Sequence, residues 1–231
     1  MTAGSRIAVA AVGFDLGETL YHYRDAPMRW LEEGRPAIER IVDACGVDRS
    51  KDRLAAGAER PASYGTQIRE RIGRVLGSEV MADVLGAFFE FFRRSLEAYP
   101  GAVETLAALK QSGFAVGALT NVPIGMPRRI IQQDLERLRL APYIDGFVTS
   151  FEVGSRKPHG APFERLAATL GVDLREIAYV GNLPTDVTGA LAVGCVPIFL
   201  DRTQRGIDYG QAATVYHLNE IPPLLNHTVS R

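Results

Sequence analysis

The sequence has little cysteine and almost no net charge, and each shortage excludes a class of protein. Cys45 and Cys195 are the only cysteines in 231 residues and lie far apart, so they can form neither a disulfide framework nor a cysteine-based zinc site. The formal net charge of -1 provides no basic surface that could neutralise a nucleic-acid backbone. We therefore expect a cytoplasmic protein that does not bind nucleic acid.

Long hydrophobic runs are also missing. The apolar stretch near the N-terminus, residues 7–14, is too short for a membrane span or for a signal-peptide core with its cleavage site. We expect neither a membrane segment nor an export signal. The composition, 46% hydrophobic and 23% charged, is that of a globular protein long enough to bury a core.

Short apolar runs recur along the chain and predict a parallel sheet. A run that is apolar at consecutive positions is typical of a strand buried on both faces. Six strands are predicted, the last from a weaker pattern: residues 7–14, 114–119, 144–148, 177–180, 196–200 and 214–218.

Helical patterns alternate with these runs from residue 101 onward. Apolar residues recur at spacings of three and four from Val103, from Ile131 and from Phe163, as on amphipathic helices. Alternating strands and helices form right-handed crossovers around a doubly wound sheet. We predict an α/β, Rossmann-like core.

Residues 24–99 interrupt the alternation, because they carry helical patterns and no convincing strand. One amphipathic pattern includes Leu31, Ile38 and Val42, and a later one ends at Pro100. We expect an all-helical domain over residues 24–99, inserted into a core domain made of residues 1–23 and 100–231.

Four short motifs follow four of the predicted strands. They are Asp15 to Leu20, Leu119 to Asn121, Arg156 to Pro158, and Val180 to Asn182 with Asp186 close behind. Because the carboxyl ends of parallel strands meet at one edge, the motifs should gather in one crevice. Their carboxylate, hydroxyl, ammonium and amide groups are typical of phosphoryl transfer.

Each of these groups has a plausible task in that chemistry. Asp15 can attack phosphorus and form an aspartyl phosphate. Lys157, one of only three lysines, can keep Asp15 ionised and pair with phosphate, and the Thr120 hydroxyl can donate to the transferring group.

A Mg²⁺ site is predicted beside the nucleophile. This cation takes hard oxygen ligands, which Asp15, the main-chain carbonyl of Gly17 and the side chain of Asn182 can supply. Asp186 would support that site from behind the ligands.

In this order the motifs resemble those of the haloacid dehalogenase superfamily, in the phosphatase-rich branch with a helical cap after the first motif. They are DLGET, LTN, RKPHGAPF and GNLPTD, and the flanking stretches PGAVETLAALKQSGFAVGALTN and YVGNLPTDVTGALAVG are similar as well. The resemblance implies a Mg²⁺-dependent hydrolase of a small phosphorylated metabolite. It places Thr120, Asn121, Lys157 and His22 near the substrate.

Two residues depart from that family pattern. Gly17 stands where the family has an Asp that protonates the leaving group and then activates water. Losing a general acid and base typically costs about 10²- to 10⁴-fold in rate, so leaving groups that need no proton are favoured. Asn182 replaces a metal-binding Asp, which predicts weaker Mg²⁺ binding.

Residues just after Gly17 are candidates for the missing acid. Glu18 is acidic, and the imidazole of His22 is a side chain often used for proton transfer. We expect Tyr21, His22 or Tyr23 to contact the leaving group.

Other activities stay open at this point. A 2-haloacid dehalogenase would need no second Asp, although family dehalogenases usually carry an aromatic residue at the position of Gly17. A phosphonate-cleaving mechanism would need a cap lysine, for which Lys51 is the only candidate. A degenerate member could bind a phosphorylated ligand or a partner protein without turnover. Core motifs leave the substrate and the oligomeric state undetermined.

Overall fold

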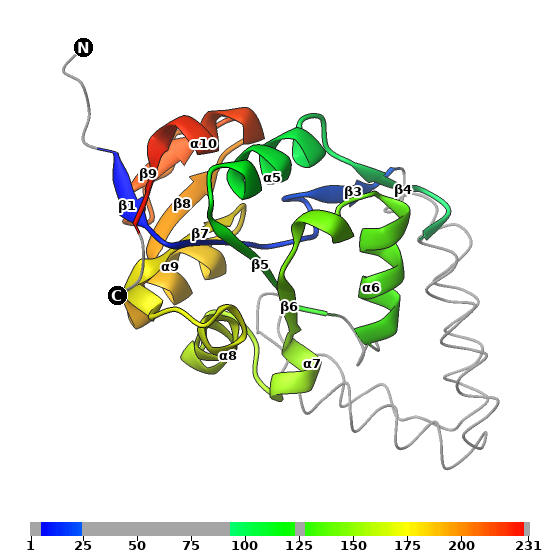
Figure 1. The fold of residues 1–231 in the computed structure, drawn as a ribbon, viewed down its shortest axis with the longest axis horizontal. Helices are drawn as coiled ribbons and strands as arrows, with labels where there is room; N and C mark the ends of the chain where they lie inside the picture. The colour runs from blue at the N-terminus through cyan, green and yellow to red at the C-terminus, as the bar shows by residue number, and fades with distance from the viewer. Residues whose placement is uncertain (1–5, 25–92, 123–127, 229–231) are drawn as a thin grey trace, which may run out of the picture.

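The computed structural model describes residues 6–24, 93–122 and 128–228, which form a sheet between two layers of helices (Figure 1). In chain order the strands and helices are β1 (Ile7–Val9), β2 (Ala11–Phe14), β3 (Tyr21–Tyr23), β4 (Leu96–Ala98), α5 (Ala102–Gln111), β5 (Ala115–Thr120), α6 (Arg128–Arg137), β6 (Gly146–Thr149), α7 (Ser150–Val153), α8 (Gly160–Leu170), β7 (Ile177–Gly181), α9 (Pro184–Val193), β8 (Val196–Leu200), β9 (Ala213–Val215), α10 (Ile221–Leu224) and β10 (Leu225–His227).

The central sheet confirms the predicted fold class. Its six strands run in the order β6-β5-β2-β7-β8-β9, and every neighbouring pair is parallel. From β2 the chain builds β5 and β6 on one side and then β7, β8 and β9 on the other. The strand order therefore reverses at β2, and ligands of such sheets bind at the carboxyl ends of the strands beside the reversal.

Helices cover both faces of this sheet. Leu106 of α5 and Ile221 of α10 belong to one buried cluster, whereas Phe163 of α8 and Ala190 of α9 belong to the other. Figure 1 shows α5 and α10 on the opposite side of the sheet from α8 and α9. None of the helices in the described ranges has the length and apolar character needed to cross a membrane.

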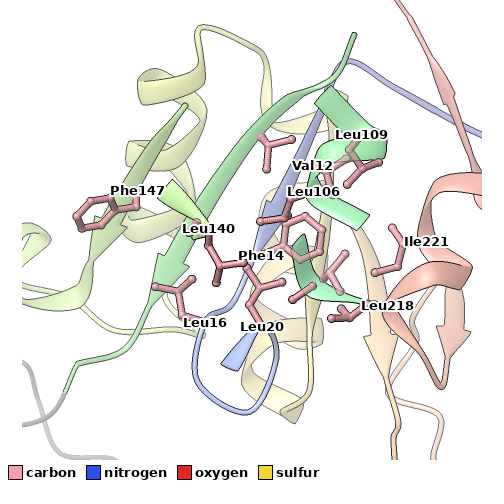
Figure 2. Packing of buried hydrophobic residues seen from close by; sticks show 14 of the residues in the cluster. Val12, Phe14, Leu16, Leu20, Leu106, Leu109, Leu140, Phe147, Leu218 and Ile221 are labelled. Atoms are coloured by element: carbon pink, nitrogen blue, oxygen red, sulfur yellow. The ribbon is translucent and has the colours of Figure 1, made fainter. Parts of the chain in front are cut away.

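The loop after β2 is fastened to the core by two leucines. Leu16 and Leu20 are fully buried, and Figure 2 shows their side chains in one cluster with Phe14 and Leu106. Burying a leucine side chain contributes about 1.5–3 kcal/mol relative to leaving it exposed. The three residues between the leucines are thus held close to the end of β2.

Two of the strand predictions are wrong in detail. Residues 7–14 form two strands rather than one, because the chain bends at Ala10, where the backbone N–H donates to Glu176 O at 2.9 Å. β1 pairs with β10 in a separate two-stranded sheet, and only β2 enters the central sheet.

The second error concerns residues 24–99, where no strand was expected. β4 lies within that range and pairs antiparallel with β3, Tyr21 opposite Ala98 and Tyr23 opposite Leu96. Three-residue strands are too short to show a periodicity of two. Residues 25–92, and with them Lys51 and most of the expected helical domain, lie outside the described residues.

We predict that Leu106→Ala lowers the free energy of unfolding by about 2–5 kcal/mol, because it leaves a cavity between α5 and the sheet. Leu191→Ala on α9 is the matched control, since that side chain is 43% exposed, and should cost less than about 1 kcal/mol. Urea denaturation of both variants measures the difference. Equal losses would show that the cluster around Leu106 is not tightly packed.

Candidate active site

Asp15 lies at the carboxyl end of β2, where the strand order reverses. Its backbone N–H donates to Val180 O at 2.8 Å, which extends the pairing of β2 with β7 by one residue. The side chain is only 8% exposed. The carboxylate is therefore fixed at the edge of the sheet and largely withdrawn from water.

Lys157 forms the centre of the site. Its side chain is 2% exposed, and its ammonium lies 2.6 Å from Asp15 Oδ1 and 2.6 Å from Asp186 Oδ1. It also donates to the Tyr179 hydroxyl at 2.9 Å and to Leu119 O at 3.1 Å. A buried charge is tolerated only when it is paired and hydrogen-bonded, and here one cation lies between two carboxylates.

The pKa of Asp15 reflects competing influences. The pKa is raised to about 6: burial raises it most, Lys157 lowers it, and the nearby Asp186 raises it further. Burial alone would lower the pKa of Lys157, but Asp15 and Asp186 raise it well above its ordinary value. Lys157 therefore favours the ionised form of Asp15, as the sequence predicts, without fully offsetting the cost of burial.

Asp186 has a second contact that orients it. Its Oδ2 accepts a hydrogen bond from the backbone N–H of Leu183 at 2.9 Å, at the start of α9. A Cβ at Gly181 would collide with the Asp186 carboxyl group. Glycine at 181 thus lets this side chain lie across the end of β7 and reach Lys157.

Tyr179 supports Lys157 from within the sheet. Its hydroxyl donates to Leu119 O at 2.9 Å while it accepts from the ammonium. A Cβ at Gly13 of β2 would approach the Tyr179 ring to 2.9 Å, closer than side-chain carbons pack. The ring fits because glycine occupies the neighbouring strand.

Thr19 links Asp15 to Asn182. Its hydroxyl lies 3.2 Å from Asp15 Oδ2 and 3.0 Å from Asn182 Oδ1. Two side-chain oxygens therefore converge on one small group, close to Gly17. Hard oxygens arranged in this way suit Mg²⁺, which needs few protein ligands. In the described part of the chain, no group of three His, Cys, Asp or Glu side chains could hold a metal ion. The oxygens near Thr19 therefore carry little negative charge, because the Asn182 amide is neutral.

Asn121 and Thr120 lie at the end of β5. Asn121 Nδ2 donates to Lys157 O at 3.2 Å, and Asn121 Oδ1 accepts from Lys157 N at 3.0 Å, so this amide fixes the backbone that carries the lysine. Thr120 is the last residue of the strand and is 6% exposed.

The expected substitutes for the missing acid have other partners. Glu18 accepts a hydrogen bond from the Tyr99 hydroxyl at 2.6 Å, and His22 stacks on the Tyr99 ring with 4.5 Å between centroids. Burial and Glu18 together raise the pKa of Tyr99 to about 12, so the phenol keeps its proton. Tyr21 is 2% exposed, which places it in the core rather than in the open site.

Gly17 itself has room for a larger side chain. A Cβ built at this position meets no atom within 4 Å. A side chain can therefore begin at this position without a collision at its Cβ.

Sequence reasoning missed three residues of this region: Thr19, Tyr179 and Arg202, whose guanidinium donates to Glu18 O and Thr19 O at 2.7 Å each. Thr19 is part of the DLGET motif, and its spacing of four from Asp15 was the available signal. Tyr179 and Arg202 carry no such signal. Tyr179 is one of several residues in the apolar run at 177–180, and Arg202 is one of many arginines.

The chain belongs to the haloacid dehalogenase-like hydrolases, because the model of that family matches residues 9–194. It is therefore a hydrolase. A phosphoglycolate phosphatase of Yersinia pseudotuberculosis is 27% identical over 219 residues, which are 91% of this chain and 87% of that protein.

A further curated relative and a solved structure are also similar to this chain. A glyceraldehyde 3-phosphate phosphatase of Methanopyrus kandleri is 30% identical and covers 84% of each chain. Among solved structures, a haloacid dehalogenase-superfamily hydrolase of Geobacter sulfurreducens superposes with a TM-score of 0.61 at 21% identity, over 98% of this chain and 100% of that one. At that identity the superposition shows the fold.

We predict that Lys157→Met lowers the free energy of unfolding more at pH 8 than at pH 5. Without the ammonium, Asp15 and Asp186 are unpaired buried like charges, and the pKa of Asp15, which burial already raises, loses the opposing effect of Lys157. Removing one partner of a buried ion pair costs about 3–5 kcal/mol. The folded variant then binds more protons than the unfolded chain, so its stability falls as pH rises.

Lys110→Met is the matched control for this measurement. Lys110 pairs with Asp145 at 2.6 Å on the surface, and such pairs contribute about 0–1 kcal/mol. Urea denaturation at both pH values compares the two variants. A loss for Lys157→Met that is independent of pH would contradict the proposed charge balance.

Proposed function

We propose that the chain is a Mg²⁺-dependent phosphohydrolase that acts on a small phosphorylated metabolite through an aspartyl phosphate at Asp15. The observation that carries the proposal is the buried Asp15 carboxylate, 2.6 Å from Lys157 Nζ at the end of β2. The phosphatase names of its relatives support the substrate class.

In the first step an Asp15 oxygen attacks phosphorus, and the bond from phosphorus to the leaving group breaks. Thr120 and Asn121, at the end of β5, bind the phosphoryl oxygens together with Lys157. In the second step water cleaves the aspartyl phosphate, which releases inorganic phosphate and restores the Asp15 carboxylate.

The residues that would hold Mg²⁺ are Asp15, Asn182 and Gly17, the last through its main-chain carbonyl, with Asp186 bracing the site through Lys157. When bound, the cation would offset the negative charge of the carboxylate and the phosphoryl group. Asn182 supplies an oxygen without a charge, so we expect weaker affinity than an aspartate would give.

Gly17 determines which leaving groups are accepted. The substrates named for the relatives are alkyl phosphates, whose departing alkoxide needs a proton. The carboxylate of an acyl phosphate and the phenolate of an activated aryl phosphate can depart without a proton. Acyl phosphates and activated aryl phosphates should therefore be the better substrates here. We place His22 beside the leaving group.

Residues 24–99 form the cap in this proposal, and residues 1–23 and 100–231 form the core. Cap closure would exclude bulk water from the phosphoenzyme. We assign the enzyme to the cytoplasm.

A second candidate function is binding of a phosphorylated ligand without turnover. Gly17 and Asn182 favour it, because both remove carboxylates that the family uses in catalysis. Thermal stabilisation by a phosphorylated compound without phosphate release would support this function, since a ligand that binds only the native state raises the melting temperature.

We predict that phosphate release requires both Asp15 and Mg²⁺. Asp15→Asn should lose activity by on the order of 10⁴-fold or more, because it removes the nucleophile, and a chelator should abolish activity in the wild type. The assay measures inorganic phosphate from 2-phosphoglycolate, an aryl phosphate and an acyl phosphate. Full activity in Asp15→Asn would exclude the covalent mechanism.

We predict that Gly17→Asp increases hydrolysis of alkyl phosphates by about 10²-fold or more relative to the aryl phosphate, because it adds a general acid where the loop has room. Gly17→Asn is the matched control, with the same shape and no proton to transfer. The ratio of kcat/KM for the two substrates is the quantity compared. If both variants change that ratio equally, the missing acid does not limit the reaction.

A further inference from the structure

Three side chains from separate segments stack where the inserted residues join the core. The Arg202 guanidinium lies over the Tyr99 ring, with its carbon 3.6 Å from the centroid. The Tyr99 ring stacks on His22 at an angle of 22°. His22 belongs to β3, Tyr99 follows β4 and Arg202 follows β8, so the stack joins the start and the end of the insertion to the central sheet.

Arg202 also holds the loop that follows Asp15. One guanidinium nitrogen donates to Glu18 O at 2.7 Å and the other to Thr19 O at 2.7 Å. The planar fork of arginine suits two adjacent acceptors, and a lysine cannot reproduce it. The two carbonyls belong to successive residues, so this contact fixes the orientation of the peptide between them.

Tyr99, which follows β4, also forms hydrogen bonds to the loop after Asp15. Its hydroxyl donates to the Glu18 carboxylate, and its backbone N–H donates to Leu20 O at 2.9 Å. Glu18 has a positive φ of 58°, a conformation that costs free energy in a residue other than glycine. Contacts from Arg202 and Tyr99 on both its main chain and its side chain keep this residue in place.

The geometry of Asp15 depends on that loop. The Thr19 hydroxyl, one residue beyond Glu18, lies within hydrogen-bond distance of Asp15 Oδ2 and of Asn182 Oδ1 and can donate to either. A change in the peptide held by Arg202 would move this hydroxyl and the Gly17 carbonyl together. A displacement of about 1 Å in a reacting group can cost 10²-fold in rate.

We propose that Arg202 is a positioning residue: it sets the Asp15–Leu20 loop in the geometry that the reaction uses and couples this loop, through Tyr99, to the return of the inserted segment. The effect on rate rests on the proposed function. The effect on the loop does not, because it follows from the contacts alone.

The test compares Arg202→Met and Arg202→Lys with Arg205→Met. Arg205 lies on the same loop, with its side chain 56% exposed and 3.9 Å from Asp201, so its replacement controls for charge loss. Hydrogen exchange of the amides from Leu16 to Tyr21 reports the loop, and kcat and KM with an aryl phosphate report the reaction.

We expect Arg202→Met to speed exchange of these amides by roughly tenfold or more, because it loses two charged hydrogen bonds, and to lower kcat by roughly 10- to 100-fold with a smaller change in KM. Arg202→Lys should have a kcat close to that of Arg202→Met, because lysine cannot donate to both carbonyls. Millimolar guanidinium should partly restore the kcat of Arg202→Met. Arg205→Met should match the wild type in both exchange and kcat.

Two results would overturn the proposal. Unchanged exchange in Arg202→Met would mean that the arginine does not hold the loop. Faster exchange with an unchanged kcat would mean that its role is only structural. Failure of the proposed function is seen separately, as absence of phosphate release from the wild type, and in that case the exchange measurement decides whether Arg202 holds the loop.

Discussion

The ion pairs of Lys157 with Asp15 and Asp186 are the constraint on which the site depends. Three charged groups meet in a place that is almost closed to water. Their balance requires the ends of β2 and β7 and the segment before α8 to meet within a few ångströms, which the strand order achieves by placing β2 beside β7. The Asn121 side-chain amide then holds the main chain of Lys157, and the Tyr179 hydroxyl accepts from its ammonium, so the lysine has little freedom to move.

Gly17 gives this site its particular character. The ion pairs of Lys157, the two oxygens beside Thr19 and the buried Asp15 carboxylate are all in place, whereas Gly17 has no side chain that could supply a proton. The acidic and aromatic neighbours bind one another, as Glu18 and Tyr99 do. Under the proposed phosphohydrolase function, such a site would favour attack on phosphorus and slow the steps that need proton transfer.

The sheet and much of the site could be predicted from the sequence because both are local patterns. Consecutive apolar residues marked the six central strands, and motifs at their ends placed Asp15, Lys157 and Asp186 together. The roles of Tyr179 and Arg202 could not be predicted from their positions in the chain, because both form contacts between segments that are distant in sequence. The bend at Ala10 and the three-residue β4 were not predicted for a different reason. Backbone hydrogen bonds define both, and their side chains show no distinct hydrophobic period.

The most direct test of the central claim is a rapid-quench experiment with an aryl phosphate and Mg²⁺, followed by mass spectrometry of the peptide that contains Asp15. The first step needs no proton for this leaving group, while the second lacks the base that would activate water. We therefore expect a burst of phenol equal to the enzyme concentration and one phosphoryl group on Asp15. Steady release of phenol without a burst, with Asp15 unmodified, would contradict the account.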